Sequence, residues 1–199
     1  MRLKINPTRM ELLRLRRRVE IARRGHKLLK DKLDGLMQRF FTTRKEYLAL
    51  HTKLEPELAR VFSKTIMTSA LSNPLIEKSV VPAQISLETS IKNIMGVRVP
   101  SHDIKIKGKP AYNELLATVE MREGLDLFIA VLPDLVKLAA LNKTIKLLAA
   151  QIIDTRRRVN ALEYVLIPEL ERNLRFIHMQ LSERERSTRV VLLKISEEG

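Results

Sequence analysis

An apolar residue recurs every three and then four residues from Leu12 to Leu54. This average spacing of about 3.5 residues places one continuous stripe along a helix, so that two helices can pack along their whole length. The ladder consists of Leu12, Leu15, Val19, Ala22, His26, Leu29, Leu33, Leu36, Phe40, Thr43, Tyr47, Leu50 and Leu54. Only His26 and Thr43 are neither apolar nor aromatic. A repeat of this length favours a long paired helix over a globular fold.

The segment before the ladder contains two possible helix starts. Asn6 can cap the helix with Pro7 as its first residue, or Thr8 can cap it with Glu11 three residues later. From either start the helical pattern runs to about Leu71, where a Ser-Asn-Pro sequence ends it. About 60 helical residues predict a helix on the order of 95 Å long.

Residues 72–110 differ in composition from the rest of the chain. They hold four of the eight prolines and two of the six glycines. Apolar and polar residues alternate there in three short runs, which begin at Ile85, Val97 and Ile104. A period of two predicts β-strands with one apolar face. We therefore expect a small hairpin-like cap in the middle of the chain.

A second helical ladder occupies the last part of the chain. We expect this helix to begin between Ala111 and Gly124 and to end near Ile195. Its apolar residues keep the spacing of the first ladder until Pro168, after which the spacing shifts. The first ladder slips in phase at Pro56 in the same way. Because a proline removes one backbone hydrogen bond, we predict a helix kink at each of these two prolines.

Two long helices joined by a compact connection must run antiparallel. The predicted fold is mainly α: a long antiparallel two-helix coiled coil with a small β-hairpin or irregular cap in the middle. We divide one elongated domain into an N-terminal coiled-coil helix (1–71), a short-strand and loop cap (72–112) and a C-terminal coiled-coil helix (113–199). The residues expected in the coiled-coil seam are Leu12, Leu15, Val19, Leu29, Leu33, Leu36, Phe40, Leu148, Ile152, Val159, Leu162, Leu166, Ile177 and Leu181.

No group of residues in the sequence indicates catalysis or metal binding. There are no cysteines, which excludes disulfides and thiolate metal sites and fits a reducing cytoplasm. The four histidines are far apart, and none has a metal-ligand partner three or four residues away. We expect no catalytic residue, no cofactor and no metal. Charges interrupt every long apolar stretch well before ~18 residues, so we expect neither a signal peptide nor a membrane span.

The chain is strongly basic, and its charge is concentrated at one end. The formal net charge is +14, and residues 1–45 hold 15 Lys and Arg against four Asp and Glu. Such an end can attract phosphate backbones, anionic lipid or an acidic protein surface. The arginine runs at 16–18 and 156–158 are open to three interpretations: a solvated helix face, contact with an acidic collar of protein, or contact with nucleic acid. Aromatic residues that would stack on bases are missing beside them.

Several blocks of sequence resemble a known family. They are Asn6 to Leu12, Arg23 to Lys32, and Thr155 to Tyr164 with Ile167-Pro168. Together with Arg175-Phe176-Ile177 and Glu183 to Arg186, these blocks resemble the family of D subunits of V-type and archaeal-type (V/A) rotary ATPases. The resemblance covers both helices nearly end to end, whereas the segment 72–110 does not contribute to it.

The resemblance implies a central rotor shaft that transmits torque between an ATP-converting catalytic ring and a membrane ring that translocates ions. Catalytic A and regulatory B subunits would surround both helix ends. The F subunit of the stalk and a socket subunit on the membrane rotor ring would hold the opposite end. Such a shaft is itself non-catalytic, cytoplasmic and peripheral to the membrane, without direct membrane insertion and without nucleic acid. The cations expected to contact the ring are Arg9, Arg16, Arg17, Arg18, Arg24, Lys27, Arg184 and Arg189.

Two other classes of protein remain open on the residues alone. A basic coiled coil that binds nucleic acid would bind duplexes with an affinity that falls steeply with salt. A stalk protein of a flagellar or secretion export ATPase would also place a two-helix coil inside a ring. A plain coil with a short loop suits that export role better than the ~40-residue middle segment found here.

Overall fold

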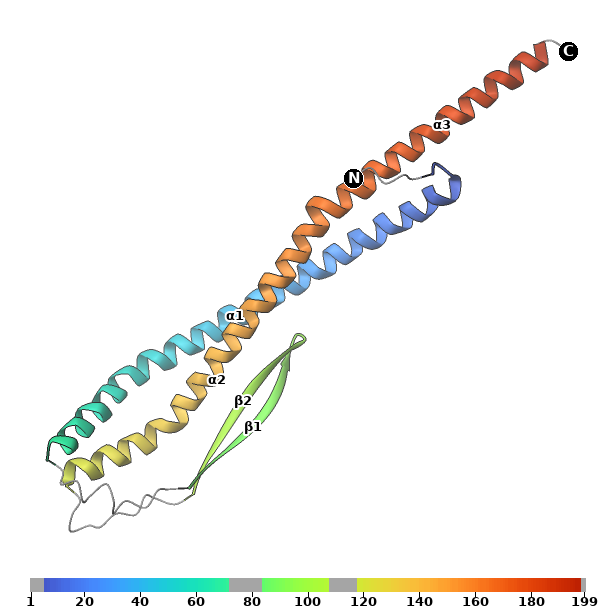
Figure 1. Ribbon diagram of the computed structural model, residues 1–199. Coiled ribbons are helices and arrows are strands. Elements are labelled where there is room, and N and C mark those ends of the chain that lie inside the picture. The colour runs from blue at the N-terminus through green and yellow to red at the C-terminus, as the bar shows by residue number, and fades with distance from the viewer. Residues whose placement is uncertain (1–5, 72–83, 108–117, 198–199) are drawn as a thin grey trace. The chain divides into compact units, whose positions relative to one another are not determined.

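The computed structural model describes residues 6–71, 84–107 and 118–197, which form long helices and one hairpin (Figure 1). Helix α1 spans Arg9–Leu71, strands β1 and β2 span Gln84–Ile94 and Val97–Lys107, and helix α2 spans Val119–Ala161. A short π-helix, η2, spans Leu162–Leu166 and leads directly into helix α3, Ile167–Glu197. The mainly α fold with a central hairpin is confirmed. The division at residues 71 and 112 stays a prediction, because 72–83 and 108–117 lie outside the described residues.

Helix α1 starts with a side-chain cap from Thr8. The Thr8 hydroxyl oxygen accepts a hydrogen bond from the Glu11 N–H (3.2 Å), and the Thr8 carbonyl oxygen accepts one from the Leu12 N–H (3.1 Å). Glu11 in the first turn also complements the positive end of the helix dipole. The Thr8 start is therefore confirmed. The alternative with Pro7 as the first helical residue is wrong, because the helix begins only at Arg9.

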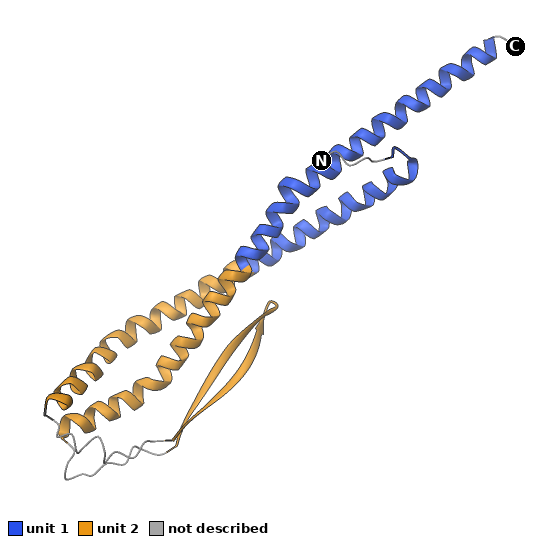
Figure 2. Ribbon diagram, viewed as in Figure 1, with its two compact units in different colours: residues 1–35, 152–199 blue, residues 36–151 orange. Residues whose placement is uncertain are grey.

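The chain divides into two compact units (Figure 2). Unit 1 contains residues 1–35 and 152–199, and unit 2 contains residues 36–151. Each unit pairs one part of α1 with a helix from the second half of the chain. The ion pairs between the paired helices are Arg9–Glu185 and Arg23–Glu171 in unit 1 and Lys53–Asp134 and Lys64–Glu123 in unit 2. Residue numbers fall on one helix as they rise on the other, so the pairing within each unit is antiparallel.

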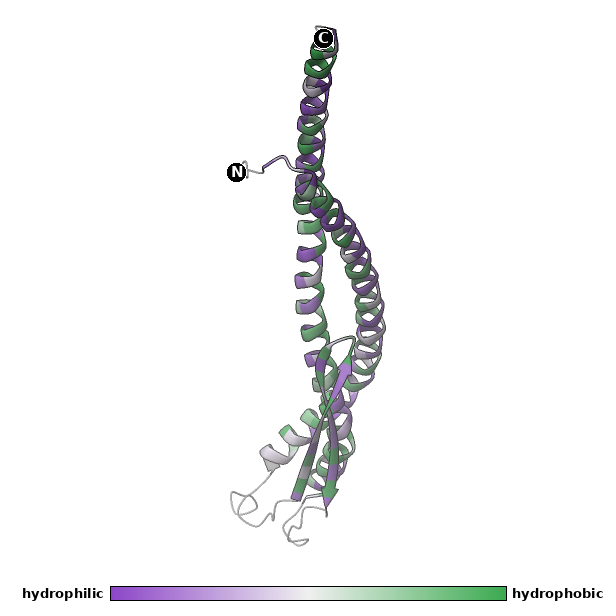
Figure 3. Ribbon diagram, turned by 90° about the vertical axis from the view of Figure 1, so that its right-hand side faces the viewer, coloured by the Kyte–Doolittle hydropathy of each residue, from purple (hydrophilic) through white to green (hydrophobic). Residues whose placement is uncertain are grey.

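The core of each unit is a seam between helices. Hydrophobic and hydrophilic residues alternate along every helix (Figure 3), as expected for helices with one packed face. The largest fully buried side chains among the described residues are Leu36, Leu54, Leu148 and Ile177. Burying a side chain of this size stabilises the folded chain by roughly 1.5 to 3 kcal/mol, so the seam holds together helices that would fray alone.

Two prolines lie at the same level of the helix pair in unit 2. Helix α1 continues through Pro56, and α2 continues through Pro133, as the predicted extents of the two helices imply. Lys53 and Asp134, each within three residues of one of these prolines, form an ion pair of 3.3 Å. Each proline removes one backbone hydrogen bond from its helix, so both helices are weakened at one level. The kink at Pro56 itself stays a prediction.

The hairpin is longer and more regular than the short runs predicted. Strands β1 and β2 pair antiparallel along all 11 residues of each. Met95 and Gly96 form the connecting turn with φ values of 52° and 90°, and the Gly96 N–H donates to Asn93 Oδ1 at 2.9 Å. Two successive positive φ values match the twist of hairpin strands. Pro100 is tolerated within β2, because both strands of a two-stranded sheet are edges.

Within unit 2 the turn end of the hairpin lies against the sides of both helices. A groove of about 660 Å³ is lined by hairpin residues between 92 and 104, by residues 39–46 of α1 and by residues 133–144 of α2. Val97 and Val99 of β2 are buried near the turn. Ile85, Leu87 and Ile91 of β1 are at least half exposed. The turn end of the hairpin is therefore the part that packs against the helices of unit 2.

Candidate functional site

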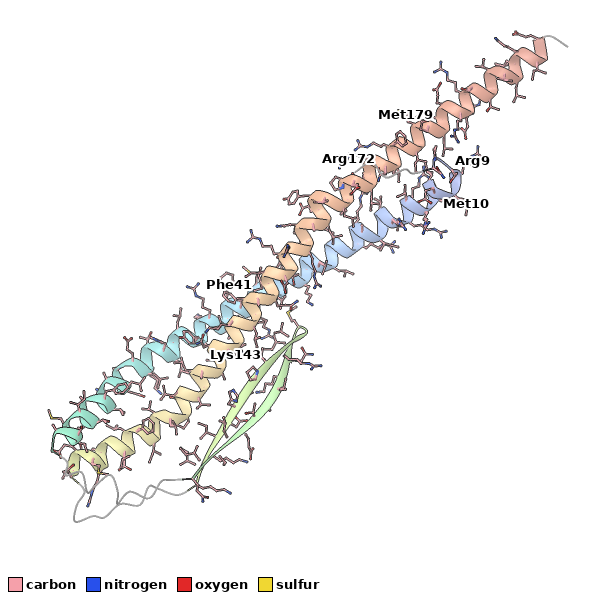
Figure 4. All side chains as sticks on the ribbon, viewed as in Figure 1. Arg9, Met10, Phe41, Lys143, Arg172 and Met179 are labelled. Atoms are coloured by element: carbon pink, nitrogen blue, oxygen red, sulfur yellow. The ribbon has the colours of Figure 1, made fainter. Side chains whose placement is uncertain are left out.

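Two charged contacts across the helices of unit 1 set the register between α1 and α3. Arg9 Nη2 lies 2.6 Å from Glu185 Oε1, and Arg23 Nη2 lies 2.6 Å from Glu171 Oε1. Figure 4 labels Arg9 at the first turn of α1. All four side chains are at least one-third exposed, so each pair contributes only about 0 to 1 kcal/mol to stability. Their main effect is to favour one alignment of the two helices.

The expected seam residues differ in their burial. The buried ones are Leu15, Val19, Leu36, Leu148, Val159 and Ile177. The half-buried ones are Leu12, Leu29, Leu33, Phe40, Ile152, Leu162 and Leu181. Leu166 differs from all of these, because its side chain is 43% exposed.

The exposure of Leu166 has a local cause in η2. Pro168 has no N–H, and in a regular α-helix its ring would collide with the carbonyl group of Tyr164. The chain widens just before it into a π-turn, in which the Ile167 N–H bonds to the Leu162 carbonyl oxygen five residues earlier. The extra residue in this turn rotates Leu166 away from the partner helix. It also accounts for the shift in apolar spacing at Pro168.

The π-turn presents a mixed surface next to the seam. Tyr164 and Val165 are 71% and 61% exposed. Glu163 Oε2 lies 3.4 Å from His26 Nε2 of α1, and the His26 side chain is only 21% exposed. His26 therefore occupies the ladder as a partly buried histidine with a polar partner, with no metal-binding arrangement around it among the described residues.

The cations expected to contact a ring fall into two groups. Three of them have partners within the chain: Arg9 pairs with Glu185, Arg24 pairs with Glu20 one turn earlier, and the Arg184 Nη1 donates to the Pro7 carbonyl oxygen at 3.3 Å. The others are exposed and have no ion pair among the described residues. They are Arg16, Arg17, Arg18, Lys27 and Arg189. This second group is available to a partner.

A basic groove in unit 1 includes a residue that sequence reasoning missed. Its volume is about 550 Å³, and its lining residues are Arg16, Val19, Glu20, Arg23, Arg24, Glu171, Leu174 and Arg175. The sequence analysis named Arg175 only within the block Arg175-Phe176-Ile177, which contributes to the family resemblance, and not as a contact residue. The pattern of a single helix does not show which residues of another helix lie opposite, so nothing in the sequence joined Arg175 to Arg16.

The end of α3 has an apolar surface without a partner helix. Glu185 lies opposite the first turn of α1, and α3 continues beyond it to Glu197 (Figure 1). In this extension Val190, Val191, Leu192 and Leu193 are 49% to 62% exposed. The sequence ladder continues into this segment, but in the described part of unit 1 no helix covers it.

The helices of unit 2 approach closely at Gly124. A Cβ atom built at Gly124 would lie 3.4 Å from the Cβ atom of Lys64. Next to this contact, Lys64 Nζ donates to Glu123 Oε2 at 2.5 Å. The hydrogen bond to Glu123, and then the negative charge of Glu123, raise the pKa of Lys64 above its ordinary value of 10.5.

Neither a metal centre nor a membrane-spanning helix is found in the described residues. No three His, Cys, Asp or Glu side chains come together there in a way that could hold a metal ion. None of the helices described is both long enough and apolar enough to cross a membrane.

Sequence comparisons with known proteins give matches along nearly the whole chain. The sequence profile that describes the D subunit of ATP synthase matches residues 11–197. A protein named as the D subunit of V-type ATP synthase from Thermoanaerobacter sp. (strain X514) is 43% identical over 199 residues, covering 97% of this chain and 95% of that protein. A protein of the same name from Clostridium botulinum (strain Langeland) is 43% identical over 204 residues, covering 98% and 94%. This chain belongs to the family of ATP synthase D subunits.

Proposed function

We propose that this chain is the central stalk subunit of a V/A-type rotary ATPase. It would act as the rotor shaft that transmits torque between the ATP-converting ring and the ion-translocating membrane ring. The observation that carries this proposal is the match, over nearly the full length of both chains, to relatives named as D subunits of V-type ATP synthase. The long helices paired in antiparallel within each unit suit such a role mechanically.

A shaft must resist both fraying and sliding of its helices. Isolated helices are marginal in water, and most of their stability in proteins comes from packing an apolar face. The buried leucines of the seam supply that packing, and interlocked side chains oppose movement of one helix along the other. The ion pairs across the helices, such as Arg23–Glu171, add a preference for one register.

The shaft itself is non-catalytic in this proposal. ATP would be converted in the ring, and the shaft would favour a different open or closed state in each ring subunit as it turns. A binding partner shifts the equilibrium between two states of a subunit only if it binds one state more tightly than the other. The shaft must therefore make different contacts with different ring subunits. Kinks at Pro56 and Pro168 would supply such asymmetry. Pro56 lies inside α1, and Pro168 is the second residue of α3, directly after the π-helix η2, which supports this role.

The proposed partners follow from the exposed surfaces. Catalytic A and regulatory B subunits would surround unit 1, where the apolar end of α3 lies exposed together with the cations that have no ion pair within the described part of the chain. The F subunit of the stalk and a socket subunit on the membrane rotor ring would contact the other end of the shaft. The chain would be cytoplasmic and peripheral to the membrane. The names of the relatives favour neither a nucleic-acid-binding protein nor an export stalk.

Co-purification tests this function. The gene for this chain is deleted in its host, and the ATPase complex is purified with and without the chain supplied from a plasmid. We expect the chain to co-purify with the ring subunits, and we expect its removal to separate ATP hydrolysis from ion pumping. Fully coupled pumping without the chain would refute the proposal. Duplex binding that weakens steeply with salt would instead support the nucleic-acid alternative.

A further inference from the structure

The basic groove of unit 1 contains more positive charge than its own acids neutralise. Within it Arg23 pairs with Glu171 at 2.6 Å, and Arg24 pairs with Glu20. These two pairs use both carboxylates of the groove. The two other arginines of the groove, one from α1 and one from α3, have no ion pair among the described residues. They are Arg16 and Arg175.

We propose that this groove is a docking site for an acidic segment of a ring subunit. Two carboxylates of that segment would meet Arg16 and Arg175, and an apolar side chain between them would contact Val19 and Leu174. The inference rests on the proposed function, and it specifies where the shaft is held and by what chemistry. It also assigns a role to Arg175.

Protein carboxylates fit the groove better than other anions. An arginine guanidinium presents a planar pair of N–H donors that matches a carboxylate, and such charge-assisted bonds are stronger than neutral ones. The positive charges alternate with Glu20 and Glu171, which would repel a closely spaced polyphosphate. A partner with two separated carboxylates avoids this repulsion and can pair with each free arginine.

The apolar part of the groove supports the same occupant. Leu174 is half-buried and Val19 beside it is 8% exposed, so Leu174 supplies most of the apolar groove surface that is still open to water. An apolar side chain of the partner placed over Leu174 would remove its own surface and that of Leu174 from water. Exclusion of water would also strengthen the neighbouring charge pairs. Neither free phosphate nor a nucleic-acid backbone offers an apolar group for this surface.

Charge reversal in the assembled complex is the first test. The test variant carries Arg16→Glu and Arg175→Glu. The control variant carries Lys30→Glu and Arg186→Glu, which make the same change in net charge on the same two helices at exposed residues outside the groove. Circular dichroism of each purified chain establishes that both remain helical. We expect the test variant to lose about ten-fold or more in ATP-driven pumping, and the control to stay within about two-fold of the wild type.

Cross-linking identifies the partner atoms. Arg16→Lys and Arg175→Lys keep the positive charge and introduce a primary amine. A carbodiimide converts a nearby carboxylate of the partner to an O-acylisourea, the lysine amine attacks its carbonyl carbon to form an amide, and a urea leaves. We expect mass spectrometry to find the new lysines joined to Asp or Glu residues of a ring subunit.

The outcomes separate this inference from the proposed function. The docking site would be overturned if the test and control variants had equal effects on pumping and neither new lysine formed a cross-link. If the wild-type complex still pumped in a coupled way, the shaft function would stand. A wild-type chain that does not assemble with the ring would overturn both. A cross-link from either position to a carboxylate of the ring, together with loss of pumping in the test variant alone, supports the docking site.

Discussion

Replacement of Leu54 by Ala tests whether the helices are held by their seam. Leu54 is 1% exposed in unit 2, so its whole side chain is removed from water. Its truncation removes three carbon atoms at about 0.8 kcal/mol each, and the cavity left between two helices adds about 1 kcal/mol. Ala has a slightly better helix propensity than Leu, which offsets a few tenths of a kcal/mol of this loss. The expected loss in the free energy of unfolding is about 3 kcal/mol.

Leu48 provides the matched control, since it lies on the same helix in the same unit and is 49% exposed. We expect Leu48→Ala to cost about 1 kcal/mol or less, because half of its surface already contacts water. Urea unfolding followed by circular dichroism measures both. With a slope of about 2 kcal/mol per molar urea, Leu54→Ala lowers the midpoint by about 1.5 M and Leu48→Ala by about 0.5 M or less. Equal shifts for the two variants would refute a seam-dominated fold.

Three further predictions concern the helix contacts and the prolines. Gly124→Ala should raise the thermal midpoint, because it adds about 1 kcal/mol of helix propensity and its Cβ would meet Lys64 at an ordinary contact distance; a lowered midpoint in a thermal melt would contradict this. Because the pKa of Lys64 is raised above 10.5 in the folded chain, protonated Lys64 stabilises the fold fully below pH 10.5. This stabilisation is lost as the pH rises through the higher folded-state pKa. The wild-type midpoint should therefore fall more steeply above pH 10.5 than that of Lys64→Gln, and parallel curves would exclude a role for this pair. Pro56→Ala and Pro168→Ala each restore one backbone donor and should reduce the number of ions pumped per ATP hydrolysed. Unchanged coupling in single-complex rotation and pumping assays would rule out the prolines as the source of rotor asymmetry.

Sequence patterns predicted the helices and strands well, because the forces that favour a helix or a strand act between residues close together in the sequence. The spacing of apolar residues follows from the helical repeat itself, so it indicated both long helices before any contact was known. The start at Thr8 could not be separated from a start at Asn6, because both sequences can cap and only the formed turn distinguishes them. The hairpin was recognised by alternation, but its full length depended on the turn at Met95 and Gly96.

The sequence by itself determined that this chain forms long amphipathic helices, a hairpin between them and a basic N-terminal segment. Its resemblance to the D-subunit family was also readable from the residues. Only the tertiary structure decided which helix faces meet: that Leu166 turns outward at η2, that Pro133 lies at the level of Pro56, and that Arg175 shares a groove with Arg16. The reason is that periodicity is a property of one helix, whereas the register between two helices depends on packing across the seam.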